Sequence, residues 1–263
     1  MDIKNTAINA ARKAGLVLKE NLGKVNRIEF KGAVDIVTEM DKRSEALIKE
    51  EITKTFPDHG ILAEESDELK TTSGFRWVID PLDGTTNYAH GFPFFCVSIG
   101  FEEKGEVVLG VVYDPMLDEL FVAEKGKGAY LNGSRIHVSK VGSLDRSLLA
   151  TGFPYDLRTS KENNLDFFSI FSLKAQAIRR AGSAALDLSY IASGRFDGYW
   201  ELKLKPWDVA AGSLIVKEAG GVITDFKGNP YSIYSLECLA TNGLIHNDMM
   251  EILSRTTVDD NAS

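Results

Sequence analysis

The order of the hydrophobic segments is the feature that most constrains how this chain of 263 residues can fold. Between about residues 94 and 131, four short β-type segments follow one another, separated by breaks rich in Gly, Pro and Asp. This pattern predicts an antiparallel meander, because strands joined by short turns pair with their sequence neighbours. After about residue 148 strands and helices alternate, which is typical of a layered α/β arrangement.

Amphipathic spacing predicts the other elements. Thr38 is a good N-cap for the second helix, and Asp41, three residues later, suits a capping box. The expected helices span residues 2–22, 38–56, 165–173, 184–192, 207–219 and 244–253. The expected strands span residues 25–30, 60–63, 77–79, 94–102, 107–113, 119–123, 128–131, 148–152, 176–179, 196–202 and 238–241. We predict an N-terminal α+β subdomain over residues 1–140 and a C-terminal α/β subdomain over residues 141–263.

Composition and charge exclude several classes of function. The chain has 30 Lys and Arg against 38 Asp and Glu, a formal net charge of −8. This charge argues against direct nucleic-acid binding, which depends on cations that neutralise phosphates. The sequence shows neither a membrane-length apolar run nor a signal-peptide pattern, so we expect a cytoplasmic protein with no membrane partner. Cys96 lies in an apolar run, which disfavours a disulfide framework or a zinc site formed with Cys238.

The stretch WVIDPLDGTTNY at residues 77–88 is the most informative for chemistry. An apolar strand delivers Asp80 to its C-terminal end, and Pro81 is expected to stop ladder pairing there. Asp83 follows in a turn, where it can point to the same place as Asp80. Carboxylates this close repel each other unless a cation lies between them. Magnesium prefers hard oxygen ligands, and the carbonyl of Leu82 is a further candidate.

A helix start directly follows these carboxylates. Gly84, Thr85 and Thr86 are expected to form its first turn, whose free N–H groups attract an anion. The stretch therefore suggests metal-assisted chemistry on a phosphate. Asp, Pro and Gly are also common in ordinary turns, so an Asp-x-x-Asp-Gly sequence alone is weak. Taken singly, the pair at residues 64–65 can be a solvated acidic pair.

Three segments, in the order in which they occur along the chain, resemble the signatures of the inositol monophosphatase family of magnesium-dependent, lithium-sensitive sugar phosphatases. They are AEES at residues 63–66, the stretch at 77–88, and WDVAAG at 207–212 with EAGG at 218–221. The resemblance covers nearly the whole chain. It implies an α+β or α/β sugar phosphatase fold, a layered αβαβα sandwich with an antiparallel N-terminal sheet and a mixed C-terminal sheet. It also implies a homodimer.

The resemblance assigns roles at the site. It implies two or three magnesium ions per subunit, with metal ligands Glu64, Asp80, the carbonyl of Leu82, Asp83 and Asp208. Thr85 would hydrogen-bond the attacking water, with its hydroxyl oriented by Asp41, and Glu64 would assist. The residues implied to bind substrate are Asp83, Gly84, Thr85, Gly182, Ser183, Ala184, Glu201 and Asp208. Lys31 matches a basic residue in a mobile loop, and none of the four histidines falls in the implied site.

The expected reaction is hydrolysis of inositol monophosphate by a metal-activated water. Arg179 and Arg180, with Lys203 and Lys205, leave open a larger substrate such as the 2′-phosphate of NADP or fructose 1,6-bisphosphate. Arg supplies a bidentate fork for a second phosphate, although these bases can equally balance an acidic cleft or face solvent. A regulatory binding protein with residual phosphatase activity is the other alternative.

Overall fold

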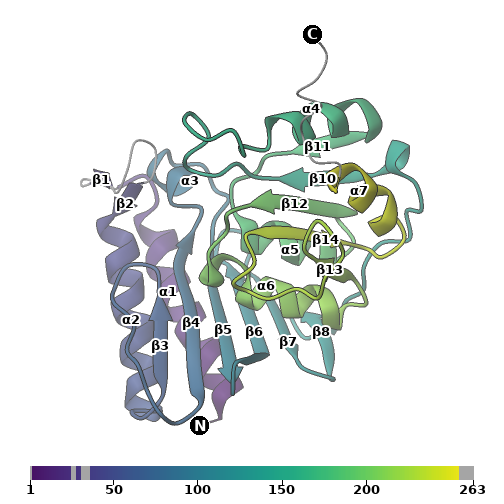
Figure 1. Ribbon diagram of the computed structural model, residues 1–263. Coiled ribbons are helices and arrows are strands. Elements are labelled where there is room, and N and C mark those ends of the chain that lie inside the picture. Colours follow the sequence, from purple (N-terminus) through teal and green to yellow (C-terminus); the bar gives the residue numbers. More distant parts are fainter. Residues whose placement is uncertain (1, 25–27, 31–35, 255–263) are drawn as a thin grey trace.

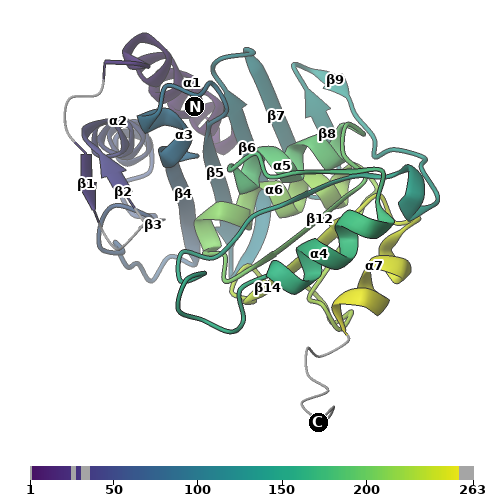
Figure 2. The same ribbon diagram turned by 90° about the horizontal axis from the view of Figure 1, so that it is seen from above.

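Five layers of helices and sheets make up the computed structural model, which describes residues 2–24, 28–30 and 36–254. A helical pair, a seven-stranded sheet, a second helical pair, a five-stranded sheet and a third helical pair follow one another (Figures 1 and 2). The expected αβαβα sandwich is therefore confirmed. The predicted strand residues 25–27 and Lys31 lie outside the described residues.

The seven-stranded sheet contains the predicted meander. Its strands, in their order across the sheet, are β3 (Gly60–Ala63), β4 (Phe75–Asp83), β5 (Cys96–Glu103), β6 (Glu106–Asp114), β7 (Glu119–Glu124), β8 (Gly128–Leu131) and β9 (Ser134–Arg135). All neighbouring pairs are antiparallel except β3 and β4, which are parallel. The antiparallel N-terminal sheet is thus confirmed, with one parallel strand at its edge.

Helices α1 (Ile3–Asn21) and α2 (Glu39–Thr55) cover one face of this sheet. A stripe of buried alanines that includes Ala7 and Ala14 lets α1 pack closely. The Thr38–Asp41 capping box begins α2, as predicted. Beside these helices β1 (Ile28–Phe30) pairs with β2 (Ile36–Thr38), a strand that the sequence analysis missed.

Helices α5 (Ala184–Ala192) and α6 (Pro206–Glu218) lie between the two sheets (Figure 2). Small residues let α6 approach β5 and β6 closely. A Cβ atom at Gly100 would lie 2.7 Å from Cβ of Ala210, and one at Gly110 would lie 2.6 Å from the backbone oxygen of Ala211. Because α6 is held this close to the sheet, its amino end is fixed relative to the end of β4.

The five-stranded sheet is mixed, as expected. Its strand order is β11 (Ala177–Arg179), β10 (Leu148–Thr151), β12 (Gly198–Leu202), β14 (Glu237–Thr241) and β13 (Val222–Thr224). The first three are mutually parallel neighbours, and β14 is antiparallel to both β12 and β13. Helices α4 (Leu165–Lys174) and α7 (His246–Leu253) cover its outer face, and a short 3-10 turn (Leu144–Arg146) precedes β10. β9 and β13 were not predicted.

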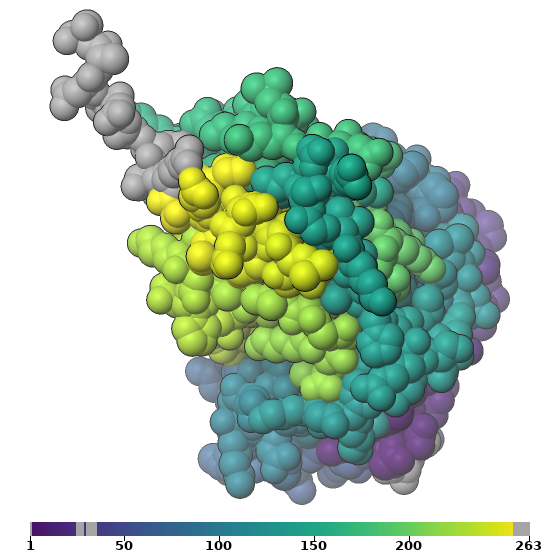
Figure 3. All heavy atoms as spheres, turned by 90° about the vertical axis from the view of Figure 1, so that its right-hand side faces the viewer, coloured from purple at the N-terminus to yellow at the C-terminus, as the bar shows by residue number. Residues whose placement is uncertain are grey.

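The segment that connects the two sheets is held against the end of β14. On the face shown in Figure 3, yellow residues near the carboxyl end lie against teal residues from the middle of the chain. Asn242 donates to the hydroxyl of Ser139 at 2.9 Å and to the carbonyl of Val141 at 2.8 Å. A division of the chain near residue 140 stays a prediction. Among the helices that the structure describes, none is long and apolar enough to cross a membrane.

Candidate active site

β4 ends in a bulge that presents two carboxylates. The strand runs to Asp83, so the predicted end at Pro81 is wrong. Asp80 pairs with Ser98 and Asp83 with Cys96, which leaves one extra residue on β4. The missing N–H of Pro81 falls inside this interruption, so the proline costs no ladder hydrogen bond.

The turn after β4 places Thr85 over a buried acid. Gly84 has a φ of 103°, and a Cβ there would lie 2.9 Å from the carbonyl oxygen of Phe94. This glycine is the N-cap of α3 (Thr85–Ala89), a helix of five residues. The Thr85 hydroxyl lies 2.8 Å from Oδ1 of Asp41 and 3.0 Å from the carbonyl oxygen of Leu82.

Asp41 makes the two contacts predicted for it, to Thr38 and to Thr85. Its Oδ2 accepts from the backbone N–H and the hydroxyl of Thr38 at 2.8 and 2.6 Å, which is the capping interaction of α2. Its other oxygen faces Thr85. Burial raises the pKa of Asp41, although these hydrogen bonds oppose the shift. Asp41 does not line the cavity described below, but it contacts Thr85, which does.

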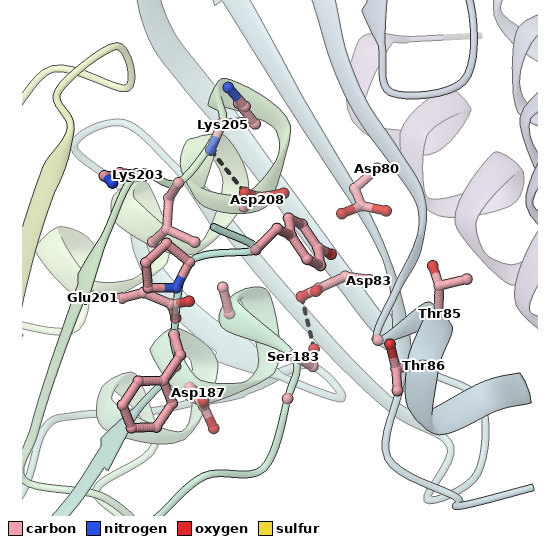
Figure 4. A pocket seen from close by; sticks show the side chains of 18 of the residues that line it. Asp80, Asp83, Thr85, Thr86, Ser183, Asp187, Glu201, Lys203, Lys205 and Asp208 are labelled. Atoms are coloured by element: carbon pink, nitrogen blue, oxygen red, sulfur yellow. Dashed lines mark hydrogen bonds between the residues drawn. The ribbon is translucent and has the colours of Figure 1, made fainter. Parts of the chain in front are cut away.

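A third carboxylate faces β4 from the amino end of α6. Oδ2 of Asp208 accepts from the backbone N–H of Lys205 at 2.7 Å. Oδ2 of Asp83 accepts from the hydroxyl of Ser183, also at 2.7 Å. Figure 4 shows Asp80, Asp83 and Asp208 around a common space, with Thr85 and Thr86 beyond Asp83.

These groups line a cavity of about 260 Å³ between the two sheets. Its walls come from the end of β4, the start of α3, the amino ends of α5 and α6, β12, and the loop after β10. The predicted site residues that line it are Glu64, Asp80, Leu82, Asp83, Gly84, Thr85, Gly182, Ser183, Ala184, Glu201 and Asp208. Residues far apart in the sequence are therefore brought together as the resemblance implies.

Burial and mutual repulsion disfavour the charged forms of these carboxylates. Burial raises the pKa of Asp80 and Asp208 well above the ordinary value, and neighbouring carboxylates add to both shifts. Burial also raises the pKa of Asp83 to about 6, against the hydrogen bond from Ser183. Among the described residues none of the three forms an ion pair with Lys or Arg. Like charges confined without a counter-charge favour a bound cation.

The donor set suits a hard cation. It consists of carboxylates and a backbone carbonyl, and oxygen ligands are what magnesium prefers. Within residues 2–24, 28–30 and 36–254, no three His, Cys, Asp or Glu side chains lie close enough together to hold a metal ion by themselves. The carboxylates line the cavity instead, which suits magnesium because it keeps several of its waters.

The far end of the cavity carries two more acids. The Tyr199 hydroxyl donates to Oε2 of Glu201, and burial raises the pKa of Glu201 to about 7. Gly152 leaves the space for this carboxylate, since a Cβ there would overlap it. Asp187 is 1% exposed, and its Oδ1 has no hydrogen-bond partner among the described residues. Burial and the nearby Glu201 raise its pKa well above the ordinary value.

Sequence reasoning missed part of this wall. Asp187 lies in the 182–187 run whose first three residues were expected to contact substrate, so its position was a usable signal. Gly152 and the loop Phe153, Pro154 and Tyr155 also line the cavity, and no local pattern marks them. As expected, no histidine lines this cavity.

The four basic residues singled out in the sequence differ in placement. Arg180, Lys203 and Lys205 line the cavity, and Arg179 does not. Nζ of Lys203 is held by Asp156 Oδ2 at 2.7 Å and Ser160 Oγ at 2.9 Å. Among the described residues, no ion pair engages Arg180 or Lys205.

Comparisons with known proteins show the family of this chain. The model of the inositol monophosphatase family matches residues 2–259. An inositol-1-monophosphatase of Synechocystis sp. is 47% identical over 252 residues, 95% of this chain and 88% of that protein. The Nus factor SuhB of Escherichia coli is 47% identical over 227 residues, 85% of each chain.

A solved structure supports the same assignment. The inositol monophosphatase from Anabaena (Nostoc) sp. superposes with a TM-score of 0.87 at 46% identity, covering 95% of this chain and 94% of its own. The match extends through both sheets, because it covers nearly all of each chain. The chain therefore belongs to the inositol monophosphatase family and is a phosphoric monoester hydrolase of the inositol-1-monophosphatase type.

Proposed function

We propose that this protein is a magnesium-dependent phosphomonoesterase that hydrolyses inositol monophosphate. One observation carries the proposal. Three carboxylates, the buried Asp80 and Asp83 and the partly buried Asp208, face one cavity, and none of them forms an ion pair with Lys or Arg among the described residues. Their raised pKa values show that the folded chain pays an electrostatic cost there, and bound divalent cations would remove it.

The residues that would hold magnesium are those that the family resemblance implies, and all of them line the cavity. We assign Glu64, Asp80 and the carbonyl of Leu82 to one ion, and Asp80, Asp83 and Asp208 to a second. A third, weaker ion would use Glu64. When bound, magnesium lowers the pKa of water and neutralises charge on the attacking and leaving oxygens.

The chain's own groups would orient the reaction. The Thr85 hydroxyl, which donates to Asp41, would accept a hydrogen bond from the attacking water and so orient it, with Glu64 beside it. The backbone N–H groups of Gly84 and Thr85 would hold the phosphate oxygens. The alcohol would lie toward the far end of the cavity, against residues 182–184 and Glu201.

A larger substrate is the second candidate. Arg180 and Lys205 line the cavity outside the carboxylates, where a second phosphate of fructose 1,6-bisphosphate or the 2′-phosphate of NADP could pair with them. Lys203 is a poor candidate for this contact because Asp156 and Ser160 hold its ammonium group.

A substrate panel separates these candidates. With magnesium present, we expect inositol 1-phosphate to be hydrolysed with a kcat/KM at least about tenfold above that of fructose 1,6-bisphosphate or NADP, which corresponds to about 1.4 kcal/mol of transition-state binding. Phosphate release would be measured for all three under one set of conditions. Faster hydrolysis of either larger compound would contradict the assignment of the monophosphate.

A regulatory binding role is a third candidate, since one relative is named a Nus factor. The net charge of −8 does not favour direct contact with RNA, so such a role would work through a protein partner. The complete set of site carboxylates favours catalysis as the main role. Magnesium-dependent phosphate release from inositol 1-phosphate would count against a purely regulatory protein.

Several finer properties remain proposals. We infer a homodimer, and the exposed apolar side chains Leu165, Ile170 and Leu173 on α4 are candidates for its interface. Lithium inhibition, a loop role for Lys31, a cytoplasmic location and a division into residues 1–140 and 141–263 rest on the sequence and its resemblance alone.

A further inference from the structure

Asp83 is held by the amino end of a helix from the other half of the chain. Its Oδ2 accepts from the Ser183 hydroxyl and from the backbone N–H of Ala185, each at 2.7 Å. Ser183 is the N-cap of α5 and is 1% exposed. A dashed line in Figure 4 marks its hydrogen bond to Asp83. One carboxylate oxygen of Asp83 thus accepts two short hydrogen bonds from the amino end of α5.

The hydrogen bonds around Ser183 determine which group receives its single hydroxyl proton. The backbone N–H of Leu186 donates to Ser183 Oγ at 3.3 Å, which is the capping interaction of α5. Because a carboxylate oxygen can only accept, the Ser183 O–H is the donor to Asp83 Oδ2. The thiol of Cys96 also points toward Asp83 Oδ2, at 3.9 Å. Ser183 therefore has no second proton to donate to a substrate hydroxyl.

We propose that Ser183 is a positioning residue, whose hydroxyl acts through Asp83 and does not donate to the substrate. It fixes the rotation of the Asp83 carboxylate, so that Oδ2 stays on α5 and Oδ1 is presented to the cavity. The proposal rests on the proposed function, in which Asp83 is a magnesium ligand. Groups that orient a metal ligand typically change metal affinity or activity by about 10–100-fold when removed.

The two roles differ in which kinetic constant responds. Loss of a substrate contact raises KM and leaves the magnesium requirement unchanged. Loss of the positioning contact raises the magnesium concentration needed for half-maximal activity and lowers kcat, while KM for inositol 1-phosphate stays within about twofold.

The test compares Ser183→Ala with Ser189→Ala and Ser183→Thr. Ser189 is a matched control, because it is a buried serine of the same helix whose hydroxyl donates to the carbonyl of Ala185 at 2.7 Å. Magnesium binding would be measured by calorimetry without substrate, and magnesium-dependent phosphate release with inositol 1-phosphate. Thermal unfolding of each variant checks that it is folded.

We expect Ser183→Ala to bind magnesium about 10–100-fold more weakly than the wild type, Ser189→Ala to match the wild type, and Ser183→Thr to restore most of the affinity. Unchanged magnesium affinity in Ser183→Ala, an effect on KM alone, or equal losses in Ser183→Ala and Ser189→Ala would overturn the proposal. A wild type that binds magnesium and releases no phosphate would instead contradict the proposed function, and the calorimetric comparison would still decide the role of Ser183.

Discussion

Asp83→Asn and Asp208→Asn are each expected to lower kcat/KM for inositol 1-phosphate about a thousandfold at saturating magnesium. Each removes one charge from the set that faces the cavity and keeps the shape of the side chain. A metal ion contributes several kcal/mol of charge stabilisation, and about 4 kcal/mol corresponds to three orders of magnitude in rate. Phosphate release at increasing magnesium concentration measures the effect.

The fold is expected to survive both substitutions. The raised pKa of Asp208 means that its charged form destabilises the metal-free protein at neutral pH, so an amide there removes that cost. We expect a melting temperature equal to or above that of the wild type without magnesium, and a smaller increase when magnesium is added. Asp248→Asn, on the exposed face of α7, is the matched control. Near wild-type turnover in either site variant would contradict the assignment of these carboxylates.

Thr85→Ala is expected to lower kcat about a hundredfold with little change in KM. The substitution removes the hydroxyl that lies 2.8 Å from Asp41 and leaves the acid buried. Positioned proton transfer contributes about 10²–10⁴-fold, and the remaining ligands keep part of it. Steady-state kinetics on inositol 1-phosphate at saturating magnesium measure this loss.

Thr85→Ser distinguishes the role of the hydroxyl from that of the side chain's shape. It keeps the hydroxyl and loses one methyl group, so we expect activity within about fivefold of the wild type. Equal losses in Thr85→Ala and Thr85→Ser would contradict a role for the hydroxyl in orienting water. The same result would favour a packing role for the methyl group at the start of α3.

Elements with strong periodicity were predictable from the sequence. The meander from β5 to β8 and helix α5 lie within two residues of the predicted bounds. The end of β4 was not predictable from the sequence. A proline such as Pro81 usually ends strand pairing, and the bulge that accommodates it here depends on the partner strand β5. The short strands β2, β9 and β13 have two or three residues each, too few to show a period.

The site was predictable where it lies in contiguous motifs. Asp80, Asp83 and Asp208 were chosen from such motifs, and all three line the cavity. Gly152 and Asp187 were missed because their relation to Glu201 exists only once β10, α5 and β12 are packed together. The hydrogen bond from the Ser183 hydroxyl to Asp83 likewise exists only once α5 is packed against the end of β4, and the substrate contact implied for Ser183 stays a prediction.

The central claim is that the acids of this cavity form a magnesium site for phosphate ester hydrolysis. The most direct measurement is release of inorganic phosphate from inositol 1-phosphate by the wild-type chain, first stripped with a chelator and then supplied with magnesium. We expect release only after magnesium is restored, rising and then saturating with the magnesium concentration. Release that is unaffected by the chelator, or no release at saturating magnesium, would contradict it.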